Sequence, residues 1–334
     1  MNTENKDFLN IKNLVVEYTS DGQTIHAVNQ ISLQLKQGET LGLVGETGAG
    51  KTTIVKAIER ILPDPPAKIR GGEIWFEGKD ILKMDQHSLR EIRGGKISMI
   101  FQDPMTALNP VMRIGNQIAE GIRLHKKCSK WEARKEAERM LEMVGIPESR
   151  YREYPHQFSG GMKQRVVIAM ALACHPKLLL ADEPTSALDV TIQAQVLDLI
   201  NDLKIRQKTS MILVTHDLGV VAETCDHVAI IYAGQIVEYG SLKEIFEHAS
   251  HPYTIGLFKA LPNMNDENKR LEPVGGMPPD PSRLPEGCYF SPRCPYAISE
   301  CMEKPAPVRQ LEGTHICKCH RACEITGKAG DFYG

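Results

Sequence analysis

Apolar residues along this chain gather in short runs that alternate with helix-like stretches. Runs of strand length occur at 14–18 (LVVEY), 39–45 (ETLGLVG), 96–102 (KISMIFQ), 177–184 (KLLLADEP), 210–217 (SMILVTHD) and 227–234 (HVAIIYAG). Short apolar runs separated by helical patterns are typical of a mainly parallel sheet with helices packed on it. The pattern therefore predicts an α/β domain.

A long stretch in the middle of the chain lacks strand signals. Between about Asp103 and Arg165 helical patterns take over, and residues 131–144 are rich in Ala, Glu, Lys, Leu and Met. Because these residue types favour helix, we expect a helical subdomain at about 103–165, inserted in a main domain of residues 1–260.

The end of the chain differs from the rest in composition. Proline and glycine increase from Leu261 onward, which indicates a linker, because regular helices and strands do not tolerate so many of these residues. Six of the nine cysteines come after residue 287. A secreted disulfide framework would spread bridges through a short chain, so the asymmetry indicates a C-terminal extension (261–334) with chemistry of its own.

Charge and hydropathy narrow the class of protein. The 40 basic residues nearly balance the 42 acidic ones, which argues against a large electrostatic interface with nucleic acid or an anionic membrane. The start, MNTENKDFLN, lacks the features of a signal peptide, and no apolar run is long enough to cross a bilayer. We therefore expect a cytoplasmic protein without a membrane span.

Residues 45–52 read GETGAGKT and match G-x-x-x-x-G-K-[ST], a loop whose backbone N–H groups wrap nucleotide phosphates. Lys51 can reach the β- and γ-phosphates, and the Thr52 hydroxyl can bind Mg²⁺. A strand pattern before the loop and a helical pattern after it favour this reading over a glycine turn with a surface lysine. The predicted nucleotide contacts are Gly45, Gly48, Ala49, Gly50, Lys51, Thr52 and Thr53.

Two carboxylates follow the apolar run that ends at Ala181. Asp182 is a candidate for supporting Mg²⁺, and Glu183 for polarising the attacking water, since phosphoanhydride hydrolysis needs positioning and a proton acceptor. His216 follows another buried run and is a candidate contact for the γ-phosphate. Taken alone, an acidic turn and a structural histidine would be the simpler interpretations.

Together these residues resemble the nucleotide-binding subunits of ABC transporters. Residues 159–164 (SGGMKQ) are similar to the signature motif of that family, Gln102 to its Q-loop, and 186–189 (SALD) to its D-loop. Phe158 and Met162 depart from the commoner L-S-G-G-Q form. The resemblance implies a RecA-like P-loop core with a helical insertion and an antiparallel β subdomain at the N-terminal side.

The resemblance also implies how the motifs act. Two such domains pair head to tail, so that Ser159, Gly160 and Gly161 of one subunit cap the γ-phosphate that Lys51 of the other holds. Gln102 would contact Mg²⁺ and pass movement to membrane subunits, together with the helical insertion. Tyr18 matches the aromatic residue that stacks on adenine, although a half-buried structural role explains a single tyrosine nearly as well.

Three segments resemble the oligopeptide and dipeptide branch, including its nickel-type relatives, and most closely its D-type subunits. They are 101–110 (FQDPMTALNP), 251–254 (HPYT) and 283–297 (RLPEGCYFSPRCPYA). The resemblance implies a peptide importer at the cytoplasmic face of the membrane. Its partners would be a related F-type ATPase, two permease subunits and an external solute-binding protein.

Other cargo and other roles stay open. A nickel or small-solute importer of the same branch is one alternative. A soluble ABC ATPase acting on DNA or ribosomes, and an ATPase whose cysteines sense redox state, are two more.

The cysteines follow the pattern Cys288-x5-Cys294-x6-Cys301, with Cys317, Cys319 and Cys323 further on. This spacing lacks the paired C-x2-C knuckles of structural zinc and leaves an iron–sulfur cluster, zinc and unliganded thiols open. The family resemblance implies a [4Fe–4S] cluster on Cys288, Cys294, Cys301 and Cys319. The extra Cys317 and Cys323 leave the fourth ligand undecided.

Overall fold

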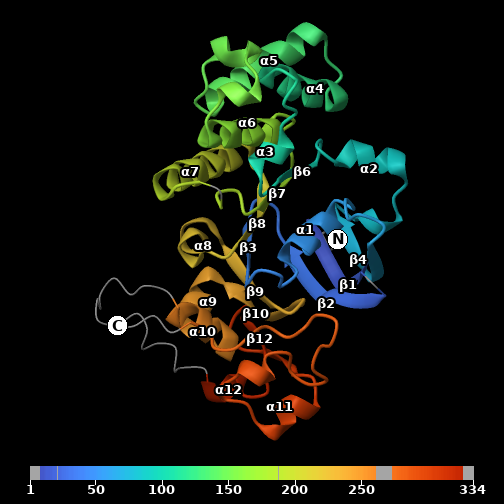
Figure 1. Ribbon diagram of the computed structural model, residues 1–334, viewed down its shortest axis with the longest axis vertical. Helices are drawn as coiled ribbons and strands as arrows, with labels where there is room; N and C mark the ends of the chain where they lie inside the picture. Colours follow the sequence, from blue (N-terminus) through green and yellow to red (C-terminus); the bar gives the residue numbers. More distant parts are fainter. Residues whose placement is uncertain (1–7, 21, 187, 261–272, 326–334) are drawn as a thin grey trace, which may run out of the picture.

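A computed structural model of the chain describes residues 8–20, 22–186, 188–260 and 273–325. Figure 1 shows an elongated molecule with a helical part at one end, two β-sheets in the middle and the C-terminal extension at the other end. The predicted α/β class is confirmed. The start of the predicted linker at Leu261 lies outside the described residues.

The smaller sheet is the antiparallel subdomain that the family resemblance implied. Its strands are β1 (Leu9–Ser20), β2 (Gln23–Leu35), β4 (Ala67–Phe76) and β5 (Lys79–Asp80), in the order β2-β1-β4-β5. Along the second half of β2, buried Ile31, Leu33 and Leu35 alternate with exposed polar residues. This period of two packs one face of the sheet against the core and leaves the other toward water.

The larger sheet carries five of the six predicted apolar runs, and the first run, 14–18, lies in β1 of the smaller sheet. Its order is β11-β12-β10-β9-β3-β8-β7-β6, and β9, β3, β8, β7 and β6 are parallel. Their bounds are β3 (Thr40–Val44), β6 (Ile97–Ile100), β7 (Leu178–Asp182), β8 (Ser210–Thr215) and β9 (His227–Tyr232). Every residue of β3, β7 and β8 is buried, because both faces of the sheet are covered.

Helices account for nearly all regular structure between β6 and β7. They are α3 (Pro104–Ala107), α4 (Ile114–His125), α5 (Lys130–Met143) and α6 (Gly160–Leu172), and they form the green upper part of Figure 1. The start of α5 has a capping box, in which Ser129 and Glu132 satisfy each other's backbone N–H groups. This explains why the Ala- and Glu-rich stretch folds as a helix from Lys130.

The remaining helices pack around the larger sheet or link its strands. They are α1 (Lys51–Ile58), α2 (Gln86–Ile92), α7 (Val190–Gln207), α8 (Leu218–Thr224), α9 (Leu242–His248), α10 (Pro252–Lys259), α11 (Ser299–Glu303) and α12 (Ala322–Ile325). Among the described residues, no helix has the length and apolar character that a membrane crossing requires.

The extension continues the core sheet. Its hairpin, β11 (Val308–Gln310) and β12 (Ile316–Lys318), pairs with β10 (Gln235–Ser241). Most buried apolar residues of the extension join the hydrophobic cluster of the main domain: Phe290, Cys317, Cys319, Ala322 and Ile325. The buried carboxylate of Glu238 accepts hydrogen bonds from the backbone N–H groups of Ser250 (2.6 Å) and His251 (3.1 Å) and from His315 Nε2 (2.8 Å). The extension is thus integral to the fold.

A buried carboxyl group at the end of α1 makes stability depend on pH. Burial raises the pKa of Glu59 to about 7, although Arg93 partly offsets the shift. The unfolded chain releases this proton near pH 4.5, so the free energy of unfolding falls as pH rises from about 4.5 to 7.

We therefore expect Glu59→Gln to raise the free energy of unfolding by up to about 3 kcal/mol at pH 8 and by less than about 1 kcal/mol at pH 5. Urea unfolding of both proteins across this pH range measures the difference. A gain that is equal at both pH values would contradict the assignment to Glu59.

Candidate functional site

The loop between β3 and α1 takes the shape that its glycines permit. Gly48 and Gly50 have φ angles of +82° and +102°, a region that residues with a Cβ rarely adopt. A Cβ on Gly50 would also overlap the carbonyl oxygen of Ala27. With Gly50 as its N-cap, α1 starts at Lys51 and directs its free N–H groups toward the loop. This is a site for a phosphate-like anion.

Lys51 lies under this loop. Its side chain is almost fully buried, and Nζ donates hydrogen bonds to the carbonyl oxygens of Gly45 (2.6 Å) and Glu46 (2.9 Å). Burial lowers the pKa of Lys51, while the carboxylates of Glu183, Asp182 and Glu46 oppose that shift. The amine is therefore held at the centre of the predicted phosphate site among three carboxylates.

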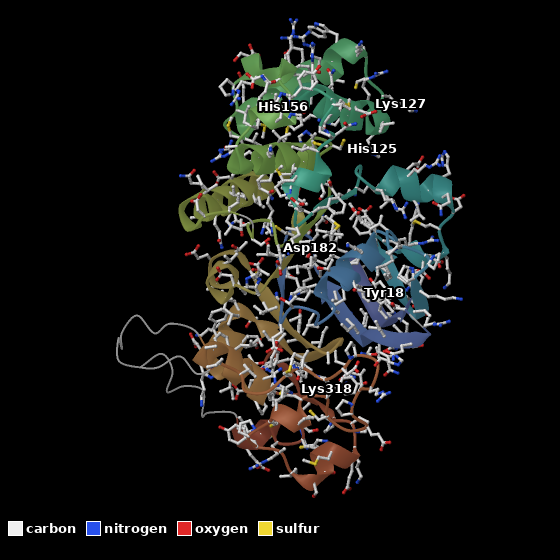
Figure 2. The ribbon with its side chains drawn as sticks, in the orientation of Figure 1. Tyr18, His125, Lys127, His156, Asp182 and Lys318 are labelled. Carbon is white, nitrogen blue, oxygen red and sulfur yellow. The ribbon has the colours of Figure 1, made fainter. Side chains whose placement is uncertain are left out.

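Thr52 and Asp182 meet at the start of α1. Thr52 Oγ1 donates to Asp182 Oδ1 at 2.9 Å, and Asp182 is buried at the end of β7, near the centre of the molecule in Figure 2. Burial raises the pKa of Asp182, and the hydrogen bond from Thr52 opposes the shift. A hydroxyl beside a carboxylate offers the oxygen ligands that Mg²⁺ prefers.

Glu183 is held between two of the predicted residues. Gln102 Nε2 donates to its Oε2 at 2.8 Å, and His216 Nδ1 lies 3.3 Å from its Oε1. Its backbone φ of +46° is unusual for a residue with a side chain, and such strain is common at functional sites. The ends of β6, β7 and β8 thus bring Gln102, Glu183 and His216 into one cluster.

Tyr18 connects the antiparallel sheet to the helix after the loop. Its hydroxyl lies 3.3 Å from Thr53 Oγ1, and Figure 2 places it in the smaller sheet. The ring is partly exposed and lies beside the predicted nucleotide contacts. Tyr18 also packs against a hydrophobic cluster of the core, so its stacking on the nucleotide base stays a prediction.

The SGGMKQ segment lies at the start of α6, in the helical part. Ser159 is the N-cap and accepts a hydrogen bond from the N–H of Met162 at 3.4 Å, and Ser159 and Gly160 are exposed. Gln164 Nε2 donates to the carbonyl oxygen of Pro184 at 2.6 Å, which ties α6 to the turn after Glu183. Among the described residues, no hydrogen bond joins Ser159, Gly160 or Gly161 to the loop at 45–53.

Comparisons with known proteins agree with these motifs. Residues 28–186 match the family described as ABC transporter, and residues 237–301 the one described as oligopeptide/dipeptide transporter, C-terminal region. The oligopeptide transport ATP-binding protein OppD of Escherichia coli is 48% identical over 318 residues, 95% of this chain and 94% of that protein. The chain belongs to the oligopeptide and dipeptide branch of ABC transporter ATPases.

Further relatives cover the chain to a similar extent. The dipeptide transport ATP-binding protein DppD of Bacillus subtilis is 50% identical over 295 residues, 88% of each chain. A solved dimeric ATP-binding cassette in a post-hydrolysis state with ADP and phosphate has a TM-score of 0.63 and 28% identity, and the match covers 70% of this chain and 98% of that one. As an ABC ATPase subunit, this chain binds and hydrolyses ATP.

Four cysteines of the ABC subunit's extension line one small cavity. They are Cys288, Cys294, Cys301 and Cys319, the four that the family resemblance implied as ligands. None of the four is in a disulfide. Cys317 is buried elsewhere and Cys323 is exposed, and neither lines this cavity. In the described parts of the chain, no three His, Cys, Asp or Glu side chains are arranged to hold a single metal ion.

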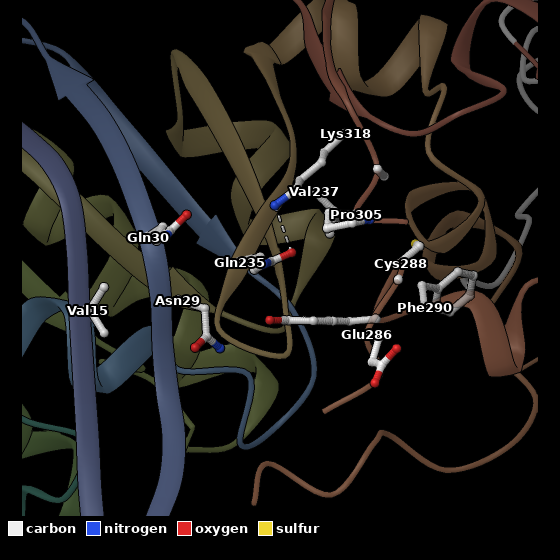
Figure 3. Close-up of a pocket in the computed structure, with 13 residues that line it drawn as sticks. Val15, Asn29, Gln30, Gln235, Val237, Glu286, Cys288, Phe290, Pro305 and Lys318 are labelled. Carbon is white, nitrogen blue, oxygen red and sulfur yellow. Dashed lines mark hydrogen bonds between the residues drawn. The ribbon is translucent and has the colours of Figure 1, made fainter. Parts of the chain in front are cut away.

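Cys288 also lies on the wall of a second pocket. This pocket has a volume of about 280 Å³ and lies between the antiparallel sheet and the extension. Figure 3 shows Asn29 and Gln30 on one side, Cys288 on the other, and Lys318 donating to Gln235 Oε1. Cys288 and Phe290 therefore line both the cysteine cavity and this pocket.

Two residues outside the predicted site set contact the phosphate loop of this ABC ATPase. Tyr253 Oη accepts a hydrogen bond from the N–H of Glu46 at 2.9 Å, and Arg293 forms an ion pair with the Glu46 carboxylate. Both residues lie in segments that resemble the peptide branch, but nothing in their spacing from the loop indicates contact with it.

A Cβ on Gly50 would overlap the carbonyl oxygen of Ala27. We therefore expect Gly50→Ala to distort the loop and to weaken ATP binding roughly tenfold or more, since such overlaps cost about 1–3 kcal/mol. Titration of the purified chain with a fluorescent ATP analogue measures this. Gly38→Ala is the matched control, because Gly38 also has a positive φ, +86°, but has open space around it. A folded Gly50→Ala protein with normal ATP affinity would contradict this prediction, because the loop would then accept a Cβ at this position.

Proposed function

We propose that the chain powers an importer of dipeptides or oligopeptides from the cytoplasmic face of the membrane. The observation that carries the proposal is the convergence of Lys51, Asp182, Glu183 and His216 at one edge of the sheet, within a chain that belongs to the peptide branch. The matched relatives are named for oligopeptide and dipeptide transport. Cargo selection would lie with the permease and solute-binding subunits.

Each residue of the cluster has a proposed role in hydrolysis. Triphosphate oxygens would take over the hydrogen bonds that Lys51 Nζ donates to the loop, and the N–H groups at the start of α1 would bind them further. Thr52, Asp182 and Gln102 would hold Mg²⁺, which neutralises phosphate charge. Glu183 would accept a proton from the attacking water, and His216 would contact the γ-phosphate.

The signature residues would complete the ATP site of a second subunit. Ser159 and Gly160 are exposed at the start of α6, where free N–H groups favour an anion. Among the described residues they are not hydrogen-bonded to the chain's own phosphate loop. We therefore infer that they contact the γ-phosphate bound by a second subunit, paired head to tail with this one. We infer that this partner is a related F-type ATPase and that the pair is a heterodimer.

Exposed apolar side chains favour docking on two membrane permease subunits. Phe101, Met105 and Val111 are 41%, 60% and 83% exposed, and they lie around or just after Gln102. Large exposed apolar residues in one segment are typical of an interaction surface. Movement of Gln102 on hydrolysis would then reach the permeases directly.

We also propose that Cys288, Cys294, Cys301 and Cys319 hold a [4Fe–4S] cluster. All four thiols line one cavity, and Cys301 and Cys319 are buried. The resemblance to the peptide branch favours an iron–sulfur cluster over zinc at these thiolates. The cluster would cross-link the extension and so help it to fold.

Exchange of Glu183 for Gln tests the proposed function. We expect ATP binding to be retained and turnover to fall roughly a hundred- to ten-thousandfold, because the proton acceptor is lost. Peptide uptake by cells that carry the variant should stop. The assay uses the complex purified with its co-expressed permeases, and exposed Glu223→Gln is the control. Normal turnover, or a chain that copurifies with ribosomes or DNA in place of permeases, would refute the proposal.

Metal analysis after purification without oxygen tests the cluster. We expect about four iron and four acid-labile sulfide per chain, and the loss of both in Cys301→Ala. Cys323→Ala is the matched control, since that thiol is exposed and outside the cavity. Stoichiometric zinc with almost no iron would reject the cluster.

A further inference from the structure

An ion pair joins the extension to the phosphate loop. The guanidinium of Arg293 donates from Nη1 and Nη2 to the two carboxylate oxygens of Glu46, at 2.8 and 2.9 Å. The side chain of Arg293 is only 4% exposed, against 27% for Glu46. Two parallel hydrogen bonds in a partly dry setting are the strongest form of arginine–carboxylate pair.

The extension and its neighbours hold Arg293 in a single geometry. Its remaining N–H groups donate to the carbonyl oxygens of Val274 (3.1 Å) and Gly275 (2.8 Å) and to the hydroxyl of Tyr232 (3.2 Å). The guanidinium also lies over the rings of Tyr232 and Phe290, at 5.7 and 5.8 Å from their centres. An arginine with this many partners is preorganised to hold Glu46 in place.

Glu46 places a carboxylate in the loop that binds triphosphate. It follows Gly45 directly, and burial lowers the pKa of Lys51 while the carboxylates of Glu183, Asp182 and, least of the three, Glu46 oppose that shift. A free carboxylate at this point would repel a nucleotide that carries several negative charges. Pairing with Arg293 cancels this charge and holds the side chain to one side, while Tyr253 Oη fixes the backbone of the same residue.

We propose that Arg293 is a positioning residue of the ATP site, through which the folded extension raises the affinity of the phosphate loop for ATP. The path is short. Arg293 precedes Cys294 in the chain, and the Phe290 ring lies 5.2 Å from Tyr232 and 5.5 Å from Tyr253. Repacking of the extension at this point moves the group that neutralises Glu46. The coupling operates whatever the cysteines bind.

Coupling of this kind is reciprocal. If the folded extension raises ATP affinity, bound ATP stabilises the extension around Arg293 by the same factor. Amide hydrogen exchange of the segment that contains residues 288–294 should therefore slow when ATP is added to the purified chain.

Equilibrium titration of the full chain with a fluorescent ATP analogue and Mg²⁺ tests the proposal. We expect Arg293→Gln to weaken binding roughly tenfold, a typical size for coupling between sites. The KM for ATP should rise while kcat at saturating ATP is retained. Arg293→Lys keeps the positive charge but cannot donate two parallel hydrogen bonds, so its ATP affinity should lie between those of the wild type and Arg293→Gln. Arg309→Gln should bind ATP as the wild type does, because within the described part of the chain the Arg309 side chain donates only to the carbonyl oxygen of His320, away from the phosphate loop.

The double variant Glu46→Gln/Arg293→Gln separates this proposal from general damage. Removal of the unpaired carboxylate should restore most of the affinity that Arg293→Gln loses. Recovery supports the proposal even if Arg293→Gln loosens the extension, because the single and the double variant both carry that substitution. Unchanged affinity in Arg293→Gln, or a loss that the second substitution does not recover, overturns it.

Discussion

The burial of the central parallel strands on both faces governs the rest of this structure. Because β3, β7 and β8 are buried throughout and apolar along their middle, polar side chains gather where the strands end. Parallel neighbours end at the same edge, so the loop before Lys51, the carboxylates of Asp182 and Glu183, and His216 converge there. Charged side chains are costly to bury along the apolar middle of these strands, so the site forms at the strand ends.

The extension adds its strands to the other edge of the same sheet, where the strands are antiparallel. Its hairpin pairs with β10, and the buried carboxylate of Glu238 joins it to the start of α10. A short segment rich in proline and cysteine cannot bury a core of its own, and here it shares the core of the ATPase. This sharing places Arg293 beside the phosphate loop, so the ATP site and the cysteine cavity lie on adjoining parts of one packed unit.

The fold and much of the site could be predicted from local patterns in the chain. The six apolar runs are strands, the Ala- and Glu-rich stretch is α5, and GETGAGKT forms the glycine loop before α1. Each of these features depends on residues close together in sequence. The antiparallel sheet, in contrast, followed only from the family resemblance, because the register shifts between β1 and β2 interrupt the alternation that would reveal it.

By itself, the sequence determined the order of strands and helices, the phosphate loop and the residue types at each strand end. The tertiary structure alone decided that Gln102 and His216 flank Glu183, that Cys319 lines the cavity while Cys317 and Cys323 do not, and that Arg293 pairs with Glu46. The physical reason is distance along the chain. Backbone propensity and side-chain periodicity act over a few residues, whereas these contacts join segments that only the packing of the shared core brings together.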